Sequence, residues 1–187
     1  METLVEICLG ISLSAACGLR IFVPPLVMGI MARWGFLHLG AGSDWMASTP
    51  ALVALGVATF LEVAAYHIPW LDNALDLMAG PLAILAGIAV SFAVLNGEDP
   101  LLRWALALVA GGGAAAAVQT ATTLARHVSS LTTGGLLNPV LAAGEALGAF
   151  LVSVAAILIP LVALAAGGTA LLIYWRRNRR STAEAIV

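Results

Sequence analysis

Charge is scarce in this sequence, and lysine is absent altogether. Charged residues make up 10% of the 187 residues, all eight positive charges are arginines, and the formal net charge is −2. Nucleic-acid binding needs a basic patch, which so few scattered arginines do not provide. The chain also lacks the GxSxG, HExxH and P-loop motifs and any spaced set of Cys and His residues. We therefore expect no enzyme activity, no cofactor and no nucleic-acid partner.

Cysteine is nearly absent too. Cys8 and Cys17 lie nine residues apart in one apolar stretch and do not form a CxxC motif. This spacing places them on different sides of a helix, so we interpret both as small packing residues. Neither a disulfide nor a metal role is expected for them.

Long apolar stretches dominate what remains. The chain is 61% hydrophobic, with a mean hydropathy of +1.04. A helix needs about 20 apolar residues to cross a bilayer, and these stretches are too long and continuous for barrel strands. The sequence therefore predicts an all-α membrane protein with about six transmembrane helices. The alternative is that residues 138–176 form one long helix, kinked at Pro160. The six predicted spans are residues 3–33, 50–68, 76–96, 102–125, 138–158 and 160–176.

Aromatic and basic residues mark the ends of these spans. All five tryptophans lie at or beside predicted ends, as expected for a belt at the membrane interface. Four arginines in residues 176–180 follow the last span and predict a cytoplasmic C-terminal tail at 177–187. An even number of spans then places the N-terminus in the cytoplasm as well, with Arg126 on that side. The expected location is the bacterial inner membrane. The tryptophans are Trp34, Trp45, Trp70, Trp104 and Trp175.

One segment of the sequence occurs twice. Residues 50–69 and 139–160 share, in order, a proline, a Phe-Leu pair, a Val-Ala-Ala step and a final Ile-Pro, with slips of one residue. Duplication in a membrane protein is typical of two structural repeats around a shared site. We predict a first three-helix repeat at 1–98 and a second at 99–176. Three spans per repeat give the copies opposite orientations in the membrane.

A proline pair interrupts the first predicted span. Pro24 and Pro25 each lack a backbone N–H and clash with the preceding helical turn. A break here exposes backbone groups that need partners, and lipid provides none. Residues 17–25 are therefore expected to line a site, and a second break is expected at Pro160.

Ionisable residues inside the predicted spans are the strongest candidates for a functional site. Arg20, Glu62 and Glu145 each carry an insertion penalty of about 2.5–3.5 kcal/mol at the bilayer centre. Helical spacing adds polar neighbours on the same faces, so these faces are expected to point inward together. Two interpretations remain open: a salt-bridge network that only stabilises the fold, or a solvated binding site. The polar neighbours are Thr59 and Tyr66 beside Glu62, Asn138 two turns before Glu145, and Gln119, Thr122, Thr123 and Arg126 in the fourth span.

Two aspartates near the third span form a second candidate cluster. Asp72 and Asp76 are four residues apart, so one helix face can carry both. With Glu62 they offer the oxygen ligands that a hard cation prefers, and His67 lies nearby. The alternative is structural, because Asp72 or Asn73 can cap a helix and acids favour its first turn. Residues 126–135 are expected to be a polar loop, either re-entrant or an ordinary connection.

Several of these motifs together resemble a known family. The sequence is similar to domain of unknown function 4126, a family of small bacterial integral membrane proteins. This resemblance implies a membrane location but no activity. His67 departs from the lysine or arginine expected before the Ile-Pro step. The motifs are Ser14 to Arg20 followed by Pro24, Glu62 through Pro69, Asp72 to Asp76, and Thr132 through Asn138 and Pro139 to Glu145.

These observations predict a transporter or channel for an ion or small polar solute, with a charged site between two inverted repeats. Glu62 and Glu145 are expected to couple to protons or cations, and Arg20 to act as a counter-charge. The alternative is a non-transporting accessory protein whose buried charges are structural. Membrane lipid is the expected surrounding partner, and the small size of the chain favours a homo-oligomer.

Overall fold

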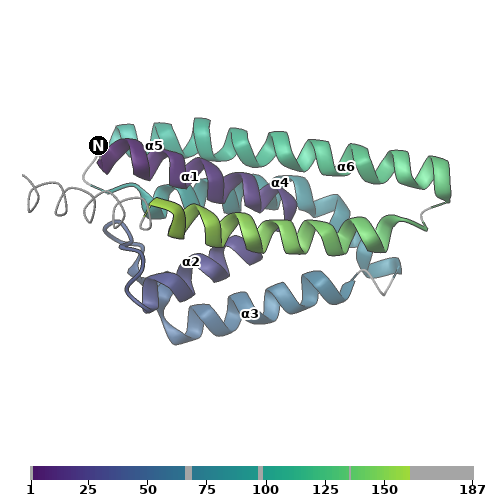
Figure 1. Cartoon of the computed structure of the whole chain (residues 1–187), viewed down its shortest axis with the longest axis horizontal. Helices are drawn as coiled ribbons and strands as arrows, with labels where there is room; N and C mark the ends of the chain where they lie inside the picture. The colour runs from purple at the N-terminus through teal and green to yellow at the C-terminus, as the bar shows by residue number, and fades with distance from the viewer. Residues whose placement is uncertain (1, 66–68, 97–98, 135, 161–187) are drawn as a thin grey trace, which may run out of the picture. The chain divides into compact units, whose positions relative to one another are not determined.

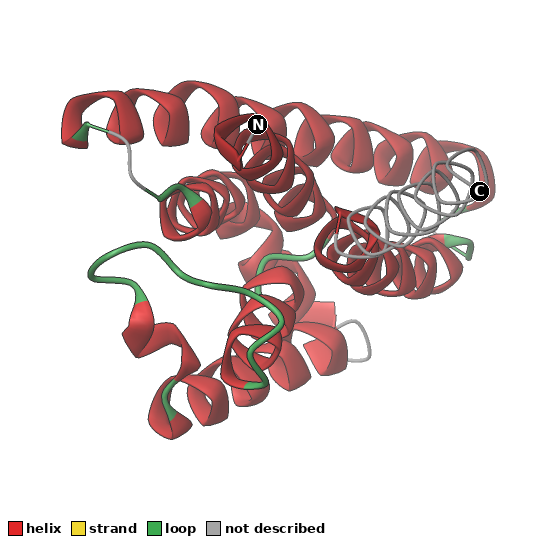
Figure 2. Cartoon of the chain, turned by 60° about the vertical axis from the view of Figure 1, so that its left-hand side comes forward, coloured by secondary structure: helices red, strands yellow, loops and turns green. Residues whose placement is uncertain are grey.

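The described part of the computed structural model is built from helices, with one long loop at residues 34–43 (Figure 2). It covers residues 2–65, 69–96, 99–134 and 136–160, and gives only the backbone of residues 2 and 69–77. Residues up to Ile157 belong to one compact unit, and Leu158 onward to another. The helices are α1 (Glu2–Leu19), α2 (Val23–Arg33), the 3₁₀ turn η1 (Asp44–Ala47), α3 (Thr49–Ala64), α4 (Pro69–Val94), α5 (Pro100–Leu106), the π-helical turn η3 (Ala107–Gly112), α6 (Gly113–Thr133) and a helix over Asn138–Pro160.

The first predicted span, 3–33, is wrong in one respect, because it forms two helices that run out and back. The N–H of Asn96 donates to the Glu6 carboxylate at 2.8 Å, and its side chain donates to the His38 carbonyl at 3.4 Å. Glu6 near the start of α1 and His38 after the end of α2 therefore lie at the same end of the molecule, which we call the Asn96 end. Figure 1 shows α2 returning beside α1.

The proline pair explains why α1 ends where it does. Its last backbone bond runs from the N–H of Arg20 to the carbonyl of Ala16 at 3.0 Å. Pro24 and Pro25 fall in the first turn of α2, where a missing N–H leaves no helical bond unmade. The predicted break is thus confirmed, but it lies at residues 20–22, before the prolines. We call residues 20–22 the hairpin tip.

The other predicted spans differ from the helices mainly at their ends. α3 stops at Ala64, and α4 begins at Pro69 rather than 76, so Asp72 and Asn73 lie inside the helix and do not precede it. The predicted loop at 126–135 is wrong, because α6 continues to Thr133 and ends at Gly134 with a left-handed φ of +63°. Glycine adopts this conformation without strain. The predicted break at Pro160 and the last span, 160–176, fall at or beyond the limit of the described residues.

Residues 50–64 of the first repeated segment lie in α3 and the second segment lies in the helix 138–160, and these two helices run in opposite directions (Figure 1). α3 leads away from the Asn96 end, since Arg33 at the end of α2 donates to Thr49 at the start of α3. The helix 138–160 begins just after the turn at Gly134 and leads back. We call the end that carries this turn the Gly134 end.

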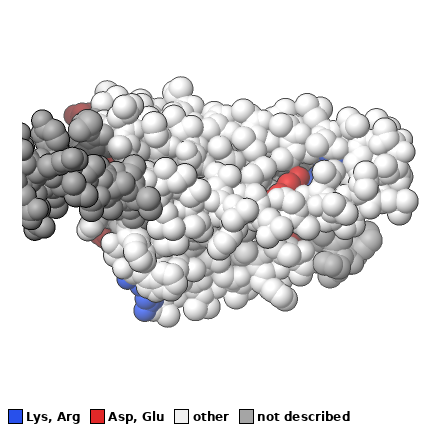
Figure 3. All heavy atoms as spheres, viewed as in Figure 1, with Lys and Arg blue, Asp and Glu red and all other residues white. Residues whose placement is uncertain are grey.

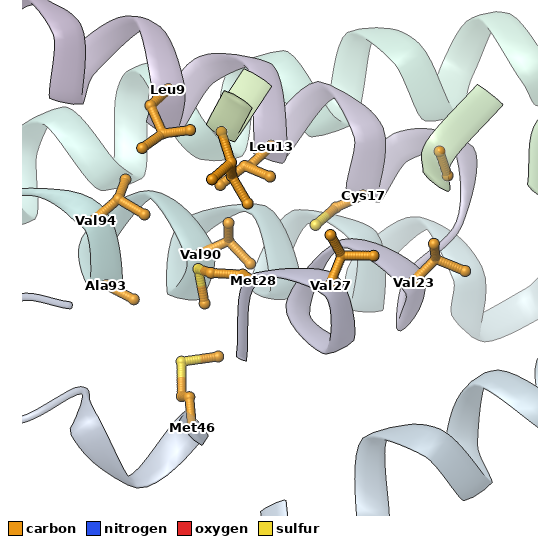
Figure 4. Packing of buried hydrophobic residues seen from close by; sticks show 12 residues of the cluster. Leu9, Leu13, Cys17, Val23, Val27, Met28, Met46, Val90, Ala93 and Val94 are labelled. Atoms are coloured by element: carbon orange, nitrogen blue, oxygen red, sulfur yellow. The ribbon is translucent and has the colours of Figure 1, made fainter. Parts of the chain in front are cut away.

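A close-packed apolar core fills the space between α1, α2 and α4 (Figure 4). Leu13, Cys17, Met28 and Val90 are fully buried, and their side chains point toward one another. The same core reaches Val94 near the Asn96 end. Burial of such side chains excludes water from the inner face of α1.

Glycine brings α1 directly against α6. A Cβ placed on Gly18 would lie 2.5 Å from the carbonyl oxygen of Ala115 and 2.7 Å from the Cβ of Val118. A Cβ on Gly87 in α4 would lie 2.6 Å from the Cβ of Ala115. Small residues at such crossings let helix backbones touch and gain van der Waals contact. The packing of α1, α4 and α6 therefore depends on these glycines.

Replacing Gly18 with alanine is expected to destabilise the fold by about 1–3 kcal/mol, the usual effect of overpacking. Gly56 in α3 is the matched control, because a Cβ there meets no atom within 4 Å. Gly56→Ala should leave stability unchanged or raise it by about 0.5–1 kcal/mol, since alanine favours helix. Thermal unfolding of the purified protein measures both. Equal midpoints for the two variants would contradict the close contact.

Candidate functional site

The hairpin tip is held by a carboxylate from another helix. Glu62 in α3 accepts hydrogen bonds from the N–H of Ile21 at 2.7 Å and of Phe22 at 3.1 Å. These donors stand at the start of α2, where the helix dipole also favours negative charge. Glu62 is 9% exposed, so both bonds are shielded from solvent. The carboxylate thus supplies the partners that the break in the helix requires.

Two arginines converge on a second carboxylate beside the tip. Arg126 in α6 donates from Nε to Oε1 of Glu145 at 3.2 Å, and its Nη2 contacts Oε2. Arg20 lies 3.5 Å from the same Oε2 and donates to the carbonyl of Ala142 at 2.5 Å. Glu145 is 9% exposed and Arg20 only 2%. Arg126 lies inside α6 and pairs across to the helix 138–160; its predicted cytoplasmic side stays a prediction.

We call Arg20, Glu62, Arg126 and Glu145 the charge cluster. Both arginines also attract the Glu62 carboxylate electrostatically, so Glu62 and the ion pairs of Glu145 influence one another. The formal charges of two arginines and two glutamates cancel. Such a balanced group can exist in an apolar interior, where an isolated charge would be strongly disfavoured. A gained proton or a bound ion would leave one charge without its counterpart.

Polar groups continue along the inner face of α6 in both directions from Arg126. The Thr122 hydroxyl donates to the Gln119 carbonyl at 2.9 Å and lies 3.5 Å from the carbonyl of Gly18. One turn after Arg126, Ser129 is 6% exposed and its hydroxyl has no hydrogen-bond partner. Thr133 donates to the Ser129 carbonyl at 2.7 Å. This face therefore links the hairpin tip to the Gly134 end.

Asn138 lies at the start of the facing helix, two turns from Glu145. Its Nδ2 donates to the Ser130 hydroxyl at 3.1 Å, while its Oδ1 is buried without a partner. Buried polar atoms are nearly always hydrogen-bonded to protein or to ordered water. Ser129 and Asn138 therefore each have a hydrogen-bonding position for water or a polar ligand.

The structure brings together most of the residues that the sequence singled out. Arg20, Glu62, Arg126 and Glu145 meet, Thr122 lies beside the tip, and Asn138 lies near the Gly134 end. The side chains of Asp72 and Asp76, together with Tyr66 and His67, fall outside the described residues, so the predicted cation cluster there stays a prediction. Within the described ranges, no three His, Cys, Asp or Glu residues gather as metal ligands.

Two parts of the site were missed by sequence reasoning. The backbone N–H groups of Ile21 and Phe22 carry no side-chain signal, although the proline pair and the required partners pointed to this segment. Ser129 was assigned to a loop because it lies in a hydroxyl-rich stretch before two glycines. Its spacing of three residues from Arg126 was the available signal, since that spacing places both on one helix face.

Comparison with known proteins identifies the family but not the activity. The model of a domain of unknown function, DUF4126, matches residues 7–180, so the chain belongs to this family. No curated protein and no solved structure matches the sequence. Any assignment of function therefore rests on the geometry of the charge cluster.

Proposed function

We propose that this DUF4126 protein is an integral membrane transporter or channel for an ion or small polar solute. The charge cluster is its binding site, and no catalytic step is involved. One observation carries the proposal: a helical hairpin ends inside the protein, and its tip, which carries Arg20, meets three charged side chains from α3, α6 and the helix 138–160. In membrane proteins, interrupted helices at depth line binding sites or aqueous cavities.

Hydropathy and the outer surface support a membrane location. Pro100–Thr133 and Asn138–Pro160 are long and apolar enough to cross a bilayer, with only 22% and 28% of their most apolar windows buried. Their outward side chains include Leu131 and Val140, at 87% and 67% exposed. Three exposed tryptophans lie near the Asn96 end, where an interfacial belt would place them. They are Trp34, Trp45 and Trp104.

The distance of the charge cluster from the Gly134 end also suits a site within a membrane. Helix α6 continues to Thr133, about 10 Å beyond Arg126 at 1.5 Å per residue. With the Gly134 end placed at the edge of a bilayer core of about 30 Å, that depth is well inside the hydrocarbon. Four ionised groups held there are more costly than apolar residues of the same size, and such residues are typically functional.

The opposed directions of α3 and the helix 138–160 support an inverted repeat. In that arrangement the two copies of the duplicated segment each bring one glutamate, Glu62 or Glu145, to the charge cluster. The two glutamates occupy different positions within the copies. The copies therefore share their opposed helix directions but not the position of the glutamate. We assign the site to the junction of these halves. The bacterial inner membrane, with surrounding lipid and a homo-oligomeric state, completes the proposal.

A second candidate function is an accessory membrane protein without transport. The cancelling charges favour it, because a balanced network needs no ligand to be stable. In that case the charge cluster only fixes the positions of α1, α3, α6 and the helix 138–160. The two candidates differ in whether a ligand stabilises the protein through Glu62.

Thermal unfolding against a panel of ions, pH values and small metabolites tests the proposal. A ligand at 100 times its dissociation constant stabilises the folded state by about 2.7 kcal/mol. We expect such a shift in the wild type and its loss in Glu62→Gln. Glu6→Gln is the matched control, because Glu6 also accepts a backbone N–H, from Asn96, but at the other end of the molecule. A panel without any shift, with Glu62→Gln merely less stable, favours the accessory protein.

A further inference from the structure

The two ends of the molecule stand at unequal distances from the charge cluster. Toward the Gly134 end, α6 extends about 10 Å beyond Arg126. Toward the Asn96 end, α1 extends back from Arg20 by 18 residues, about 27 Å. A solute therefore has a short route on one side and a long one on the other.

The long route is closed by tightly packed apolar side chains. Leu13 and Cys17 in α1 and Met28 in α2 are fully buried, on the parts of these helices that lead from the hairpin tip to the Asn96 end. Figure 4 shows their side chains packed together. Gly18 touches the backbone of α6, and the hydroxyl of Ser14 donates to the carbonyl of Gly87 at 2.7 Å. On this side the hydroxyl of Thr59 is the described buried side-chain oxygen without a partner, and a Cβ on Gly10, Gly18 or Gly87 would meet a neighbouring helix within 3 Å.

The short route has the opposite character. Ser129 and Asn138 both lie between the charge cluster and the Gly134 end, and each has a buried oxygen without a protein partner. Thr133 continues this polar face to the end of α6. At the inner end of this face lies the ion pair of Arg126 and Glu145. It is partly exposed, since the side chain of Arg126 is 17% exposed. Figure 3 shows acidic and basic atoms together right of centre, while the other charged atoms of this face lie toward its left-hand end.

We propose that water and the solute reach the charge cluster from the Gly134 end alone, between α6 and the helix 138–160. This inference rests on the proposed function and specifies it. A site open to one end and sealed toward the other belongs to a transporter in one of its access states, whereas an open channel is hydrated on both sides. The solute class is a small hydrated species, because the oxygens along the route are a hydroxyl and an amide.

Cysteine labelling tests the route without a known solute. In a background with Cys8→Ala and Cys17→Ala, Ser129→Cys is exposed to sulfonatoethyl methanethiosulfonate, a reagent that does not cross membranes. Ser153→Cys is the matched control, because Ser153 is fully buried and its hydroxyl donates to the Ala149 carbonyl at 2.6 Å. We expect Ser129→Cys to react at least about tenfold faster, because only a hydrated thiol ionises to the reactive thiolate.

Sealed vesicles then determine the side of entry. Leu136→Cys in the turn and Ala41→Cys in the opposite loop report which end faces the reagent, since both residues are exposed. Ser129→Cys should react from the side of Leu136→Cys, and Ser14→Cys from neither side. Labelling of Ser129→Cys from the Ala41 side, equal rates for Ser129→Cys and Ser14→Cys, or no labelling of Ser129→Cys overturns the inference.

Folding is checked for every variant by size-exclusion chromatography and thermal unfolding. If Ser129→Cys does not fold, Asn138→Cys takes its place, with the same expected result and the same contradicting outcomes. A ligand shift that depends on Glu62, found together with an unlabelled route, would retain the proposed function and remove only one-sided access.

Discussion

Glu145→Ala is expected to give the largest loss of stability in this protein, about 3–5 kcal/mol. This is the usual effect of removing one partner of a buried ion pair, because the remaining charge keeps its desolvation penalty. Here two arginines lose their carboxylate at once: Arg126 with its two contacts, and Arg20 at 3.5 Å. Thermal unfolding in detergent should show the fall, at about 2–4 °C for each kcal/mol in a chain of this size.

A double-mutant cycle separates this pairing from general damage. Glu145→Gln and Arg126→Gln each keep most of the side-chain volume, so packing changes little. We expect the double variant to be more stable than the sum of the two single effects predicts, by about 0.5–3 kcal/mol of coupling. Strict additivity would show that Arg126 and Glu145 do not act as a pair.

Glu62→Ala is expected to have the second-largest effect, a loss of about 2–5 kcal/mol. The substitution leaves the N–H groups of Ile21 and Phe22 without their acceptor inside the protein, at about 1–3 kcal/mol for each buried group. It also removes a negative charge from the start of α2, where the dipole favours one. Because the hairpin tip loses its partner, amide exchange at residues 21 and 22 should accelerate along with the fall in the unfolding midpoint.

The matched control is again at the Asn96 end. Glu6→Ala removes a carboxylate that accepts one backbone N–H in a partly buried position. Its expected effect is about 1 kcal/mol, the net value of an ordinary hydrogen bond. A Glu62→Ala variant no less stable than Glu6→Ala would show that the tip does not depend on Glu62.

The two proposals make these stability changes informative about function. A transporter needs a charge cluster that can change partners, because solute binding and release must alter at least one ion pair. Neutral variants of Glu62 should therefore affect both stability and ligand response. An accessory protein would show the stability change alone.

The helical class and the charged site were predictable because both follow from local composition. Long apolar stretches with few charges indicate helices in a membrane, and each ionisable residue within them needs a partner wherever the chain places it. Arg20, Glu62 and Glu145 were identified on that ground, and the structure brings their side chains to one place. Pro24 and Pro25 predicted the break because proline removes a backbone donor in any context.

The direction of the chain after the break was decided by tertiary structure. An interrupted helix can continue in the same direction or turn back, and the local sequence permits both. Here Gly18 lets α1 meet α6 closely, while Glu62 binds the N–H groups that a turn exposes. Each of these contacts joins residues at least 40 positions apart, a separation on which helical periodicity carries no information.

Pairing of the charges was likewise outside the reach of the sequence. Glu145 has two arginines as partners and Glu62 has the backbone, although either glutamate suits either role by charge alone. The sequence by itself determined that buried charges must be neutralised. The packing of α6 against the helix 138–160 decided which groups neutralise them, because side-chain reach of a few ångströms depends on how helices cross.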